Sequence, residues 1–415
     1  IVEGARERKI DLKTVANFDS MTGEGVTGSV GEHQVALGNL KLLQSLTIDA
    51  GELPSIAVTS RDQGQTVMFV AIDGKAAGLL SVADPVKGST PEAIRDLHAE
   101  GVDIVMLTGD NGITANAIAG PLGIDRVEAE VSPQQKAEII KKLQAEGRIV
   151  AMAGDGINDA PALAQSHVGI AMGTGTDVAK ETASIIVADD NFSSLVAGIE
   201  EGRFAYDNIR KVVYLLISTG GAEIVLFSLA LVFGLPLPLL AVQLLWLILV
   251  TNGIQDVALA FEGGEPGVMS RQPRPTDEGL FNRLMVTQTL ISGLTMGALA
   301  LSTWAWLLAQ GMGVQEARNF VLLLMVLLEN VHVFICRSER FSAFRIPLKR
   351  NRLLIGGVLI AQSLHILVMQ WPFMQRVLGV APVTFSAWLS LLALAGFLLV
   401  AMEIFKSLRR RSMAG

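Results

Sequence analysis

Two kinds of hydrophobic pattern divide the chain. Residues 1–203 alternate short strand-like apolar runs with helix-like patterns, and none of these runs is long. From about residue 212 onward six long apolar runs follow, each close to the ~20 residues with which a helix crosses a hydrocarbon core. These runs span residues 212–233, 239–260, 285–309, 318–336, 353–371 and 385–404. The pattern therefore predicts a soluble half followed by a membrane half of six helices, in agreement with a mean hydropathy of +0.46.

Residues 101–190 repeat a strand–turn–helix unit. The run VDIVML predicts a strand that ends at the turn TGDNG, and the helix after this turn ends at Gly123. Ser132 as N-cap, with Gln135 at the capping-box position, predicts a helix that runs to about Ala145. The runs RIVAMA, HVGIAM and ASIIVA are β-branched and short, as in buried strands. Strands that alternate with helices predict an α/β fold with a parallel sheet covered on both faces.

Two polar turns follow strands of this predicted sheet, TGD at 108–110 and AGDGINDAPAL at 153–163. Ligands of parallel sheets bind beyond the carboxyl ends of the strands, where both turns fall. Glycines let the backbone approach an anion, but a carboxylate repels that anion unless a cation lies between them. Asp155 therefore suits Mg²⁺, which prefers hard oxygen ligands and bridges to phosphate. We expect Asp159, one helical turn later, to orient the waters of the metal or a neighbouring backbone segment.

Three more side chains suit a phosphoryl group. Asn158 and Thr108 can donate hydrogen bonds to its oxygens, and Lys136 supplies a positive charge. Glycine and aspartate also dominate ordinary turns, so either turn alone fits a tight turn equally well. Both turns at strand ends, with Ser-Pro-x-x-Lys between them, favour a phosphate site.

The sequences MLTGDN, VSPQQK and AGDGINDAPAL, in this order, resemble the phosphorylation domain of P-type ATPases, which are ion pumps of haloacid dehalogenase-like (Rossmann-like) fold. The stretch ADPVK at 83–87 resembles the hinge that precedes the second part of that domain. By this resemblance Asp155 and Asp159 serve the magnesium site. The resemblance also implies a set of residues around a phosphorylated aspartate: Thr108, Gly109, Asp110, Lys136 and Asn158.

The N-terminal stretch contains a G-x-G-x-x-G sequence at Gly23, Gly25 and Gly28. A dinucleotide-binding motif needs a helix that begins at the third glycine. Here the alternating run SVGEHQVALGN follows and predicts a β-hairpin, which excludes that motif. The stretch instead resembles the α+β nucleotide-binding domain of heavy-metal-type pumps, which implies that these glycines line an ATP pocket. We expect Asp84, in the hinge, to belong to the same nucleotide site.

Basic residues lie mostly in alternate loops of the membrane half, and the remaining loops hold only Arg318 and Arg376. The positive-inside rule therefore places the soluble half, the C-terminus and the basic loops on the cytoplasmic side. We expect the membrane to be a plasma (inner) membrane. The formal net charge of −7 and the lack of a basic domain argue against a nucleic-acid partner. A single cysteine, Cys336, excludes a disulfide within the chain.

Acidic and amide side chains interrupt the apolar runs. A charge in mid-membrane is costly, so such groups are candidate functional residues. The candidates for a transported-cation site are Glu223, Thr251, Asn252, Asp256 and Glu329. Gly220-Gly221 and Asn252-Gly253 are points where a helix could loosen and offer carbonyl oxygens to a cation. The alternative is that these polar groups pair with each other between helices.

Six helices after the phosphorylation domain, with LLWLILVTNGIQDVAL in the second, resemble calcium- and sodium-type pumps, since heavy-metal-type pumps have only two helices there. By that pattern Glu223, Thr251, Asn252 and Glu329 fall on cation-ligand positions, although Asn252 replaces an acid and Asp256 is acidic where the pattern has none. The resemblance implies calcium, sodium or another hard cation, and proton transport stays open. The lack of a visible membrane Cys pair disfavours copper-like ions.

The family phosphorylates the Asp of a D-K-T-G sequence, and these 415 residues contain none. We expect it upstream of Ile1, so that the chain is the C-terminal half of an ATP-driven cation pump, inactive alone and partnered by an N-terminal half. The expected domains are 1–82 (part of the nucleotide-binding domain), 83–200 (phosphorylation domain) and 204–409 (membrane domain). Two alternatives remain, a fragment that binds nucleotide, Mg²⁺ or cation without turnover, and a membrane-anchored haloacid dehalogenase-like phosphatase.

Overall fold

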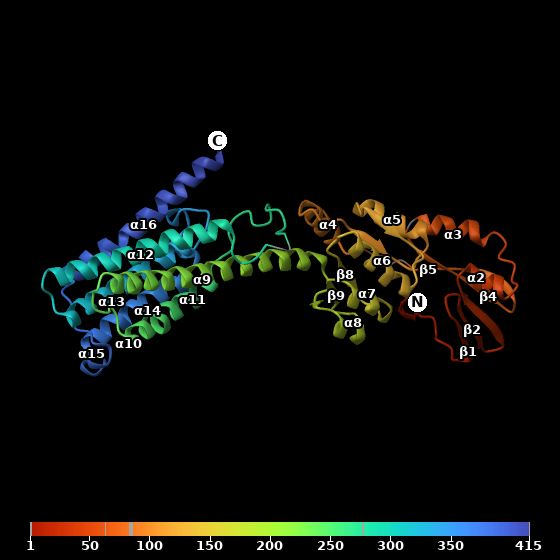
Figure 1. Cartoon of the computed structure of the whole chain (residues 1–415). Helices are drawn as coiled ribbons and strands as arrows, with labels where there is room; N and C mark the ends of the chain where they lie inside the picture. The colour runs from red at the N-terminus through yellow and green to blue at the C-terminus, as the bar shows by residue number, and fades with distance from the viewer. Residues whose placement is uncertain (1, 63, 83–85, 276–277, 415) are drawn as a thin grey trace. The chain divides into compact units, whose positions relative to one another are not determined.

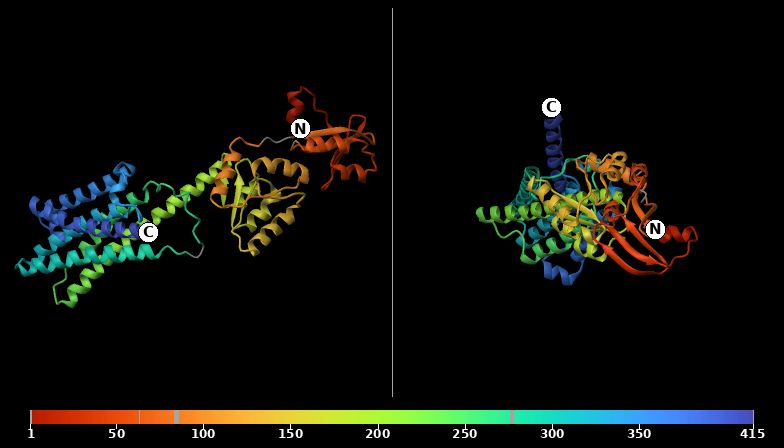
Figure 2. Two further views of the ribbon diagram at one scale, coloured as in Figure 1. Left: turned by 90° about the horizontal axis from the view of Figure 1, so that it is seen from above. Right: turned by 90° about the vertical axis from the view of Figure 1, so that its right-hand side faces the viewer.

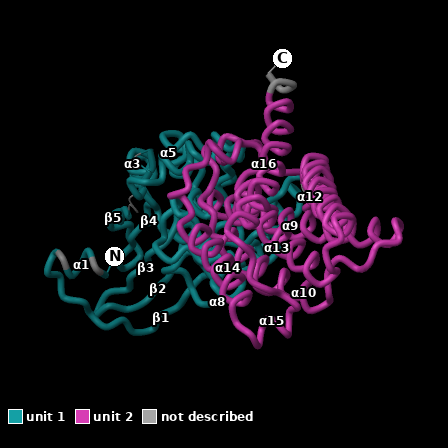
Figure 3. Tube along the Cα trace, turned by 90° about the vertical axis from the view of Figure 1, so that its left-hand side faces the viewer, with its two compact units in different colours: residues 1–198 teal, residues 199–415 magenta. Residues whose placement is uncertain are grey.

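The computed structural model describes residues 2–62, 64–82, 86–275 and 278–414 (Figure 1). The chain divides into two compact units, residues 1–198 and 199–415 (Figure 3). Asp84, which we expect in the nucleotide site, lies outside the described residues.

An antiparallel sheet opens the first unit. Its strands are β1 (Val15–Met21), β2 (Gly25–Val30), β3 (His33–Gly38), β4 (Thr66–Ile72) and β5 (Lys75–Val82), and they pair in sequence order (Figure 2). Three short helices accompany them, α1 (Val2–Glu7), α2 (Leu40–Ser45) and α3 (Leu53–Asp62). Strands β2 and β3 form the predicted hairpin, with Val30 opposite His33. Gly28 lies inside β2, so no helix begins there and the dinucleotide motif is excluded as expected.

The rest of the first unit is the predicted α/β fold. Its strands pair only in parallel, β6 (Val105–Leu107) with β7 (Arg126–Glu128), and β8 (Ala151–Gly154), β9 (Val168–Met172) and β10 (Ile185–Val187) in the order β10-β9-β8. The helices between them are α4 (Thr90–Ala99), α5 (Gly112–Leu122), α6 (Pro133–Ala145), α7 (Ala160–Gln165) and α8 (Asp177–Thr182). The fold class expected from the sequence is thus confirmed.

Local sequence signals set the helix ends in this part. Ser132 Oγ accepts a hydrogen bond from the Gln135 amide, and the Gln135 side chain accepts one from the Ser132 amide, which completes the predicted capping box. Helix α5 ends at Gly123, whose φ of +69° is the left-handed conformation that glycine adopts without strain.

Six helices in the described part of the chain are long and apolar enough to cross a membrane. They are α9 (Phe192–Val232), the broken helix Ala241–Ala260, α12 (Arg283–Ala309), α13 (Val314–Cys336), α14 (Arg352–Gln370) and α16 (Phe385–Ala414). In α16 the candidate span is Phe385–Arg410. A short helix, α15 (Pro372–Leu378), connects the last two. The prediction of six spans is confirmed, and the chain is a multi-pass membrane protein.

Helix α13 is the centre of this bundle. The protein buries 83% of its most apolar window, against 22–39% for the other five spans. Those five expose apolar side chains on their outer faces, as helices in contact with lipid do. A polar group within this window of α13 therefore generally lies in the protein interior, not at the lipid surface.

We predicted that a membrane helix could loosen at two points, and the helix deviates from α-helical geometry at only one of them. The span Ala241–Ala260 consists of α10 (Ala241–Trp246), a π-helix (Leu247–Asn252) and α11 (Gly253–Ala260), so the backbone widens just before Gly253. The expectation for Gly220-Gly221 is wrong, because α9 continues through both glycines. Helix α12 packs closely beside this stretch, since a Cβ on Gly293 would come within 3.1 Å of the Ser218 carbonyl. Small residues here bring α9 and α12 together.

Candidate functional site

The turn after β8 closes over the side chain of Asp159. This side chain is only 10% exposed, and its Oδ2 accepts hydrogen bonds from the amides of Gly156 (3.1 Å) and Asp155 (3.2 Å). A Cβ on Gly154 would lie 2.7 Å from the Asp159 Cβ. The glycine is therefore required for the close approach of strand and carboxylate, and Asp159 orients the backbone of this turn, as one of its two expected roles.

Lys136, at the start of α6, donates a hydrogen bond from Nζ to Asp159 Oδ1 at 2.7 Å. Burial acts to raise the pKa of Asp159, but the hydrogen bond and charge of Lys136 and the two amides of the turn outweigh it, and the net shift is downward. Asp159 is therefore ionised at neutral pH, and it fixes the position of the Lys136 ammonium beside the turn.

The Asp155 carboxylate differs from that of Asp159 in being exposed. Among the described residues no hydrogen-bond donor reaches it, whereas its backbone carbonyl accepts from the Thr176 amide (2.8 Å) and from Thr176 Oγ1 (3.3 Å). The backbone of the turn is thus held while the carboxylate stays free. Asn158, also exposed, lies in the same turn.

The donor set at this turn fits Mg²⁺. The described residues contain no cluster of three or more His, Cys, Asp and Glu side chains that would enclose a metal. Mg²⁺ commonly keeps several waters and binds through one or two carboxylates together with substrate phosphates. A free carboxylate on a fixed backbone, as at Asp155, is suited to that mode.

The second polar turn follows β6 and is also fixed by its backbone. The Thr108 amide donates to the Glu128 carbonyl and the Val131 amide to the Thr108 carbonyl, each at 3.0 Å. Thr108 Oγ1 donates to Asp110 Oδ2 (3.1 Å) and accepts from the Asp110 amide (3.0 Å). A Cβ on Gly109 would meet nothing nearer than 3.7 Å, so packing does not require glycine at this position.

One hydrophobic core supports both turns. Ile140, Val150 and Met152 are buried together, and Leu107, the last residue of β6, packs against this cluster. The strand ends that carry TGD and GDGIND therefore pack on one hydrophobic cluster, although β6 and β8 belong to two separate parallel sheets and not to the single sheet expected from the sequence. The roles proposed for Thr108, Gly109, Asp110, Lys136 and Asn158 remain predictions.

The glycines of the N-terminal stretch have local backbone roles. Gly23, with φ of +77°, lies in the turn between β1 and β2, and a Cβ on Gly25 would lie 2.4 Å from the Leu37 carbonyl oxygen. A Cβ on Gly28 would lie 2.6 Å from Val15 Cγ1. The folding of the sheet thus accounts for these glycines, and their contribution to an ATP pocket remains a prediction.

Within the membrane bundle, acceptor oxygens are buried without hydrogen-bond partners. They include Glu223 Oε1, Asn252 Oδ1, Asp256 Oδ1 and both carboxylate oxygens of Glu329, and also the side-chain amide oxygens of Gln255, Gln288 and Asn319. Glu329 on α13 is fully buried, and it lies within Coulombic range of Glu223 and Asp256. Buried polar groups normally find a partner, because an unpaired one loses its hydration without compensation. A shared ligand is the simplest compensation for oxygens gathered in this way.

The π-helical segment faces α9 at a residue that the sequence analysis did not single out. Asn252 Nδ2 lies 3.4 Å from Thr219 Oγ1, one helical turn before Glu223. Thr251 and Asn252 are both buried, with exposures of 1% and 3%. Thr219 could have been found from its i, i+4 spacing to Glu223 on the same face of the helix.

Amide side chains beside the acids form a second missed group. Gln255 Nε2 donates to Asn330 Oδ1 at 2.7 Å, and Asn330 Nδ2 donates to Gln362 Oε1 at 2.8 Å. These bonds connect α11, α13 and α14. The amides thus pair between helices, as the alternative interpretation expected, while the acids next to them stay unpaired.

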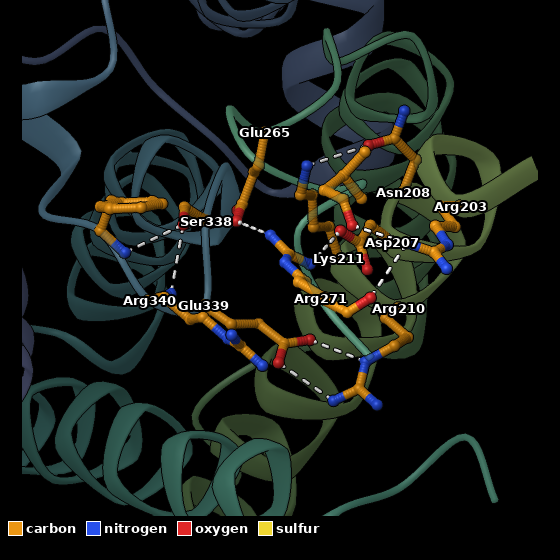
Figure 4. A network of polar contacts seen from close by, with 12 residues as sticks. Arg203, Asp207, Asn208, Arg210, Lys211, Glu265, Arg271, Ser338, Glu339 and Arg340 are labelled. Atoms are coloured by element: carbon orange, nitrogen blue, oxygen red, sulfur yellow. Dashed lines mark hydrogen bonds and ion pairs between the residues drawn. The ribbon is translucent and has the colours of Figure 1, made fainter. Parts of the chain in front are cut away.

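Ion pairs at one end of the bundle involve basic residues that the sequence analysis used only for orientation (Figure 4). Arg210 of α9 makes two hydrogen bonds to Glu339, at 2.9 and 3.0 Å. Arg271 contacts Asp207 and Glu265, each at 2.8 Å. Arg210 and Asp207 of α9 thus attach α9 to the loops that carry Glu339 and Arg271.

Another ion pair at this end is fully buried. Arg337 makes two hydrogen bonds to Glu262, at 2.9 and 3.0 Å, and both side chains are 1% exposed. Asn351 Nδ2 donates to Glu262 Oε2 (3.0 Å) and to the Ala258 carbonyl (2.8 Å). This cluster fixes the end of α11, which carries Asp256, against the end of α13, which carries Glu329.

Two protein families match the chain in separate regions. Residues 2–167 match the haloacid dehalogenase-like hydrolases, and residues 236–408 match the C-terminal region of cation-transporting ATPases. The first region contains both polar turns, and the second contains the π-helical segment and the buried Glu329.

Two relatives match most of the chain, and a third matches about half of it. A probable cation-transporting ATPase F of Mycobacterium bovis is 35% identical over 77% of this chain and 39% of its own length. A calcium-transporting ATPase of Bacillus subtilis is 34% identical over 84% of this chain and 41% of its own length. A copper-exporting P-type ATPase of Legionella pneumophila is 46% identical over 52% of this chain and 29% of its own length. The chain thus spans about two fifths of the first two relatives.

Proposed function

We propose a function on the premise that this chain belongs to the P-type cation-transporting ATPases, of which it carries the haloacid dehalogenase-like region and the C-terminal membrane domain. The gene product that contains the chain is an ATP-driven cation pump of a plasma (inner) membrane. The first unit lies on the cytoplasmic side, where ATP and Mg²⁺ are available. The pump conserves the energy of ATP in an aspartyl phosphate, and the acceptor aspartate is not among these 415 residues.

The two polar turns of the first unit are the proposed phosphate site. Bound Mg²⁺ would neutralise the charge that develops on the transferred phosphoryl group. Asp155 is the residue that would hold it, and Asp159 keeps the Asp155 backbone in place. Lys136, whose ammonium Asp159 holds in place, would contact the phosphoryl oxygens. Thr108 would contact the same oxygens. Preorganised charges of this kind stabilise a transition state without reorganisation during the reaction.

The observation that carries the transport function is the group of buried, unpartnered oxygens of Glu223, Asn252, Asp256 and Glu329. All of them are carboxylate or amide oxygens, the ligands that hard cations prefer. We propose calcium, sodium or another hard cation as the transported ion. Copper-like ions prefer thiolate and thioether ligands, and none is among these groups.

The experiment measures ATP hydrolysis by the purified gene product in proteoliposomes while Ca²⁺, Na⁺ and Cu⁺ are varied in turn. We expect stimulation by one hard cation, and Glu329→Gln should raise the concentration of that cation needed for half-maximal stimulation. Glu316→Gln is the matched control, since Glu316 is an exposed acid on the same helix. Stimulation by Cu⁺ alone, or equal effects of the two substitutions, would contradict the proposed site.

A further inference from the structure

A groove of about 410 Å³ lies on the outer surface of the bundle, between the end of α16 and the loop after α13. Its apolar part is lined by Leu399, Val400 and Ile404 of α16 and by Phe344 of the loop. Phe344 is 77% exposed, and Val400 and Ile404 are each 55% exposed. Val400 and Ile404 lie on a membrane-spanning helix, where side chains with this exposure contact lipid, and Phe344 lies in the short 3-10 turn Ala343–Arg345 of the loop. The groove is therefore a shaped part of the lipid-facing surface.

The lining changes from apolar to polar along α16. Toward the C-terminal end of the helix the groove is lined by Glu403, Ser407 and Arg410. Positions 400, 403, 407 and 410 follow helical spacing and share one face, and the stretch 399–410 rises about 16 Å. A phospholipid has the same order of polarity, acyl chain toward the membrane centre and phosphate at its edge.

Hydrogen bonds hold the loop wall of the groove in place. Lys406 Nζ donates to the carbonyls of Ile335 (2.9 Å) and Ser338 (2.8 Å), which attaches α16 to the end of α13. The Ala343 amide donates to Glu403 Oε1 at 2.8 Å, beside Phe344. Ser338 Oγ, shown in Figure 4, accepts from the next amides of the loop. A ligand therefore enters a formed groove and does not have to order the loop.

Arg410 provides the charge at the polar end. Its Nε is buried and has no hydrogen-bond partner among the described residues. The one acid of the groove, Glu403, already accepts the Ala343 amide and lies within Coulombic range of the buried Lys406. The charge left to attract a ligand is thus positive, and a guanidinium pairs well with phosphate oxygens.

We propose that this groove is a binding site for one anionic phospholipid, phosphatidylglycerol, with its phosphate on Arg410 and Ser407 and an acyl chain along Val400 and Ile404. A zwitterionic phospholipid carries the same phosphate, but its cationic headgroup is repelled by the arginine. The site is distinct from the proposed cation site, and it does not depend on which ion the pump carries.

The experiment is native mass spectrometry of the detergent-purified gene product during titration with phosphatidylglycerol or phosphatidylcholine. We expect tighter binding of the first phosphatidylglycerol, and Arg410→Gln should weaken it roughly tenfold through loss of a charge-assisted contact. Arg410→Lys keeps the charge and should retain most of the preference. Val400→Trp fills the apolar floor without a change of charge and should also weaken binding.

Arg283→Gln is the matched control, because Arg283 is an exposed basic residue at the first turn of α12, outside the groove. Equal affinity for the two lipids in the unchanged protein would overturn the proposal. An equal effect of Arg283→Gln and Arg410→Gln would show general charge attraction in place of a site. Full binding by Val400→Trp would exclude the apolar groove as the place of the acyl chain.

Discussion

Substitution of Asp155 by asparagine tests the proposed phosphate site most directly. The change keeps the shape of the side chain and removes one negative charge from the proposed Mg²⁺ ligand. The carboxylate is exposed and accepts no hydrogen bond from the described residues. We therefore expect the substitution to change the free energy of unfolding by less than about 0.5 kcal/mol. Any large loss of activity then reports on the reaction.

The size of that loss follows from the metal's contribution. Metal-assisted charge stabilisation is worth several kcal/mol, and loss of about 3 kcal/mol lowers a rate roughly one hundredfold. The assay is the initial rate of acid-stable phosphoenzyme formation from labelled ATP by the gene product that contains the chain, at a series of Mg²⁺ concentrations. Asp155→Asn should lower this rate at least about a hundredfold at saturating ATP.

Asp103→Asn is the matched control for this substitution. Asp103 lies in the same unit and pairs with Arg148, but the two side chains are 63% and 61% exposed. An exposed pair of this kind contributes about 0–1 kcal/mol, so the control should keep nearly full activity. Comparable losses in the two variants, or a rate within tenfold of normal in Asp155→Asn, would refute the metal role of Asp155.

Three other sites and the chain as a whole give further predictions. The 415-residue chain alone should form no acid-stable phosphoenzyme with labelled ATP, because it contains no D-K-T-G sequence, and robust Mg²⁺-dependent labelling would disprove this. In the gene product, Glu223→Gln should lower the apparent affinity for the transported cation while phosphorylation by inorganic phosphate persists. If ATP hydrolysis kept the same dependence on cation concentration, Glu223 would not be a ligand of the cation. The lowered pKa of Asp159 means that its contribution to stability is complete above its ordinary value of 3.8 and is lost as the pH falls through the lowered one. The protection of the backbone amides in the turn after β8, measured as their hydrogen-exchange rate relative to an unfolded peptide at the same pH, should therefore be constant near neutral pH and fall in acid. Asp159→Asn should lower this protection at neutral pH as well. Glu262→Gln should destabilise the membrane unit by about 3–5 kcal/mol, because Arg337 keeps a buried charge without its partner, and Arg337→Met with Glu262→Leu should recover most of the loss in a thermal unfolding assay.

Local signals in the sequence sufficed where neighbouring residues determine the structure. The Ser132–Gln135 capping box and the end of α5 at Gly123 depend on residues within one helical turn, and both are confirmed. The six spans follow from length and composition, which a membrane helix needs irrespective of its neighbours. The hairpin at β2 and β3 follows in the same way from alternation over a short stretch.

The sequence was insufficient where partners are distant in the chain. Lys136 and Asp159 are 23 residues apart, and spacing cannot show that the lysine contacts this carboxylate. Asn252 and Thr219 are 33 residues apart and lie on different helices. Gly220-Gly221 was expected to be a point where α9 could loosen, but α9 continues through both glycines, beside the close approach of α12 at Gly293. Tertiary packing decides such cases, and a pattern within one segment does not contain it.

The π-helical turn at Leu247–Asn252 has a consequence for insertions and deletions in the gene. A π-turn holds one residue more than the α-helical turn it replaces. Deletion of a single codon in this stretch can therefore restore a regular α-helix without breaking it. Each residue of an α-helix turns the chain by about 100°, so the residues on one side of the deletion would change faces. Such a protein would keep its six membrane spans and would still insert into the membrane, but Asn252 would no longer contact Thr219.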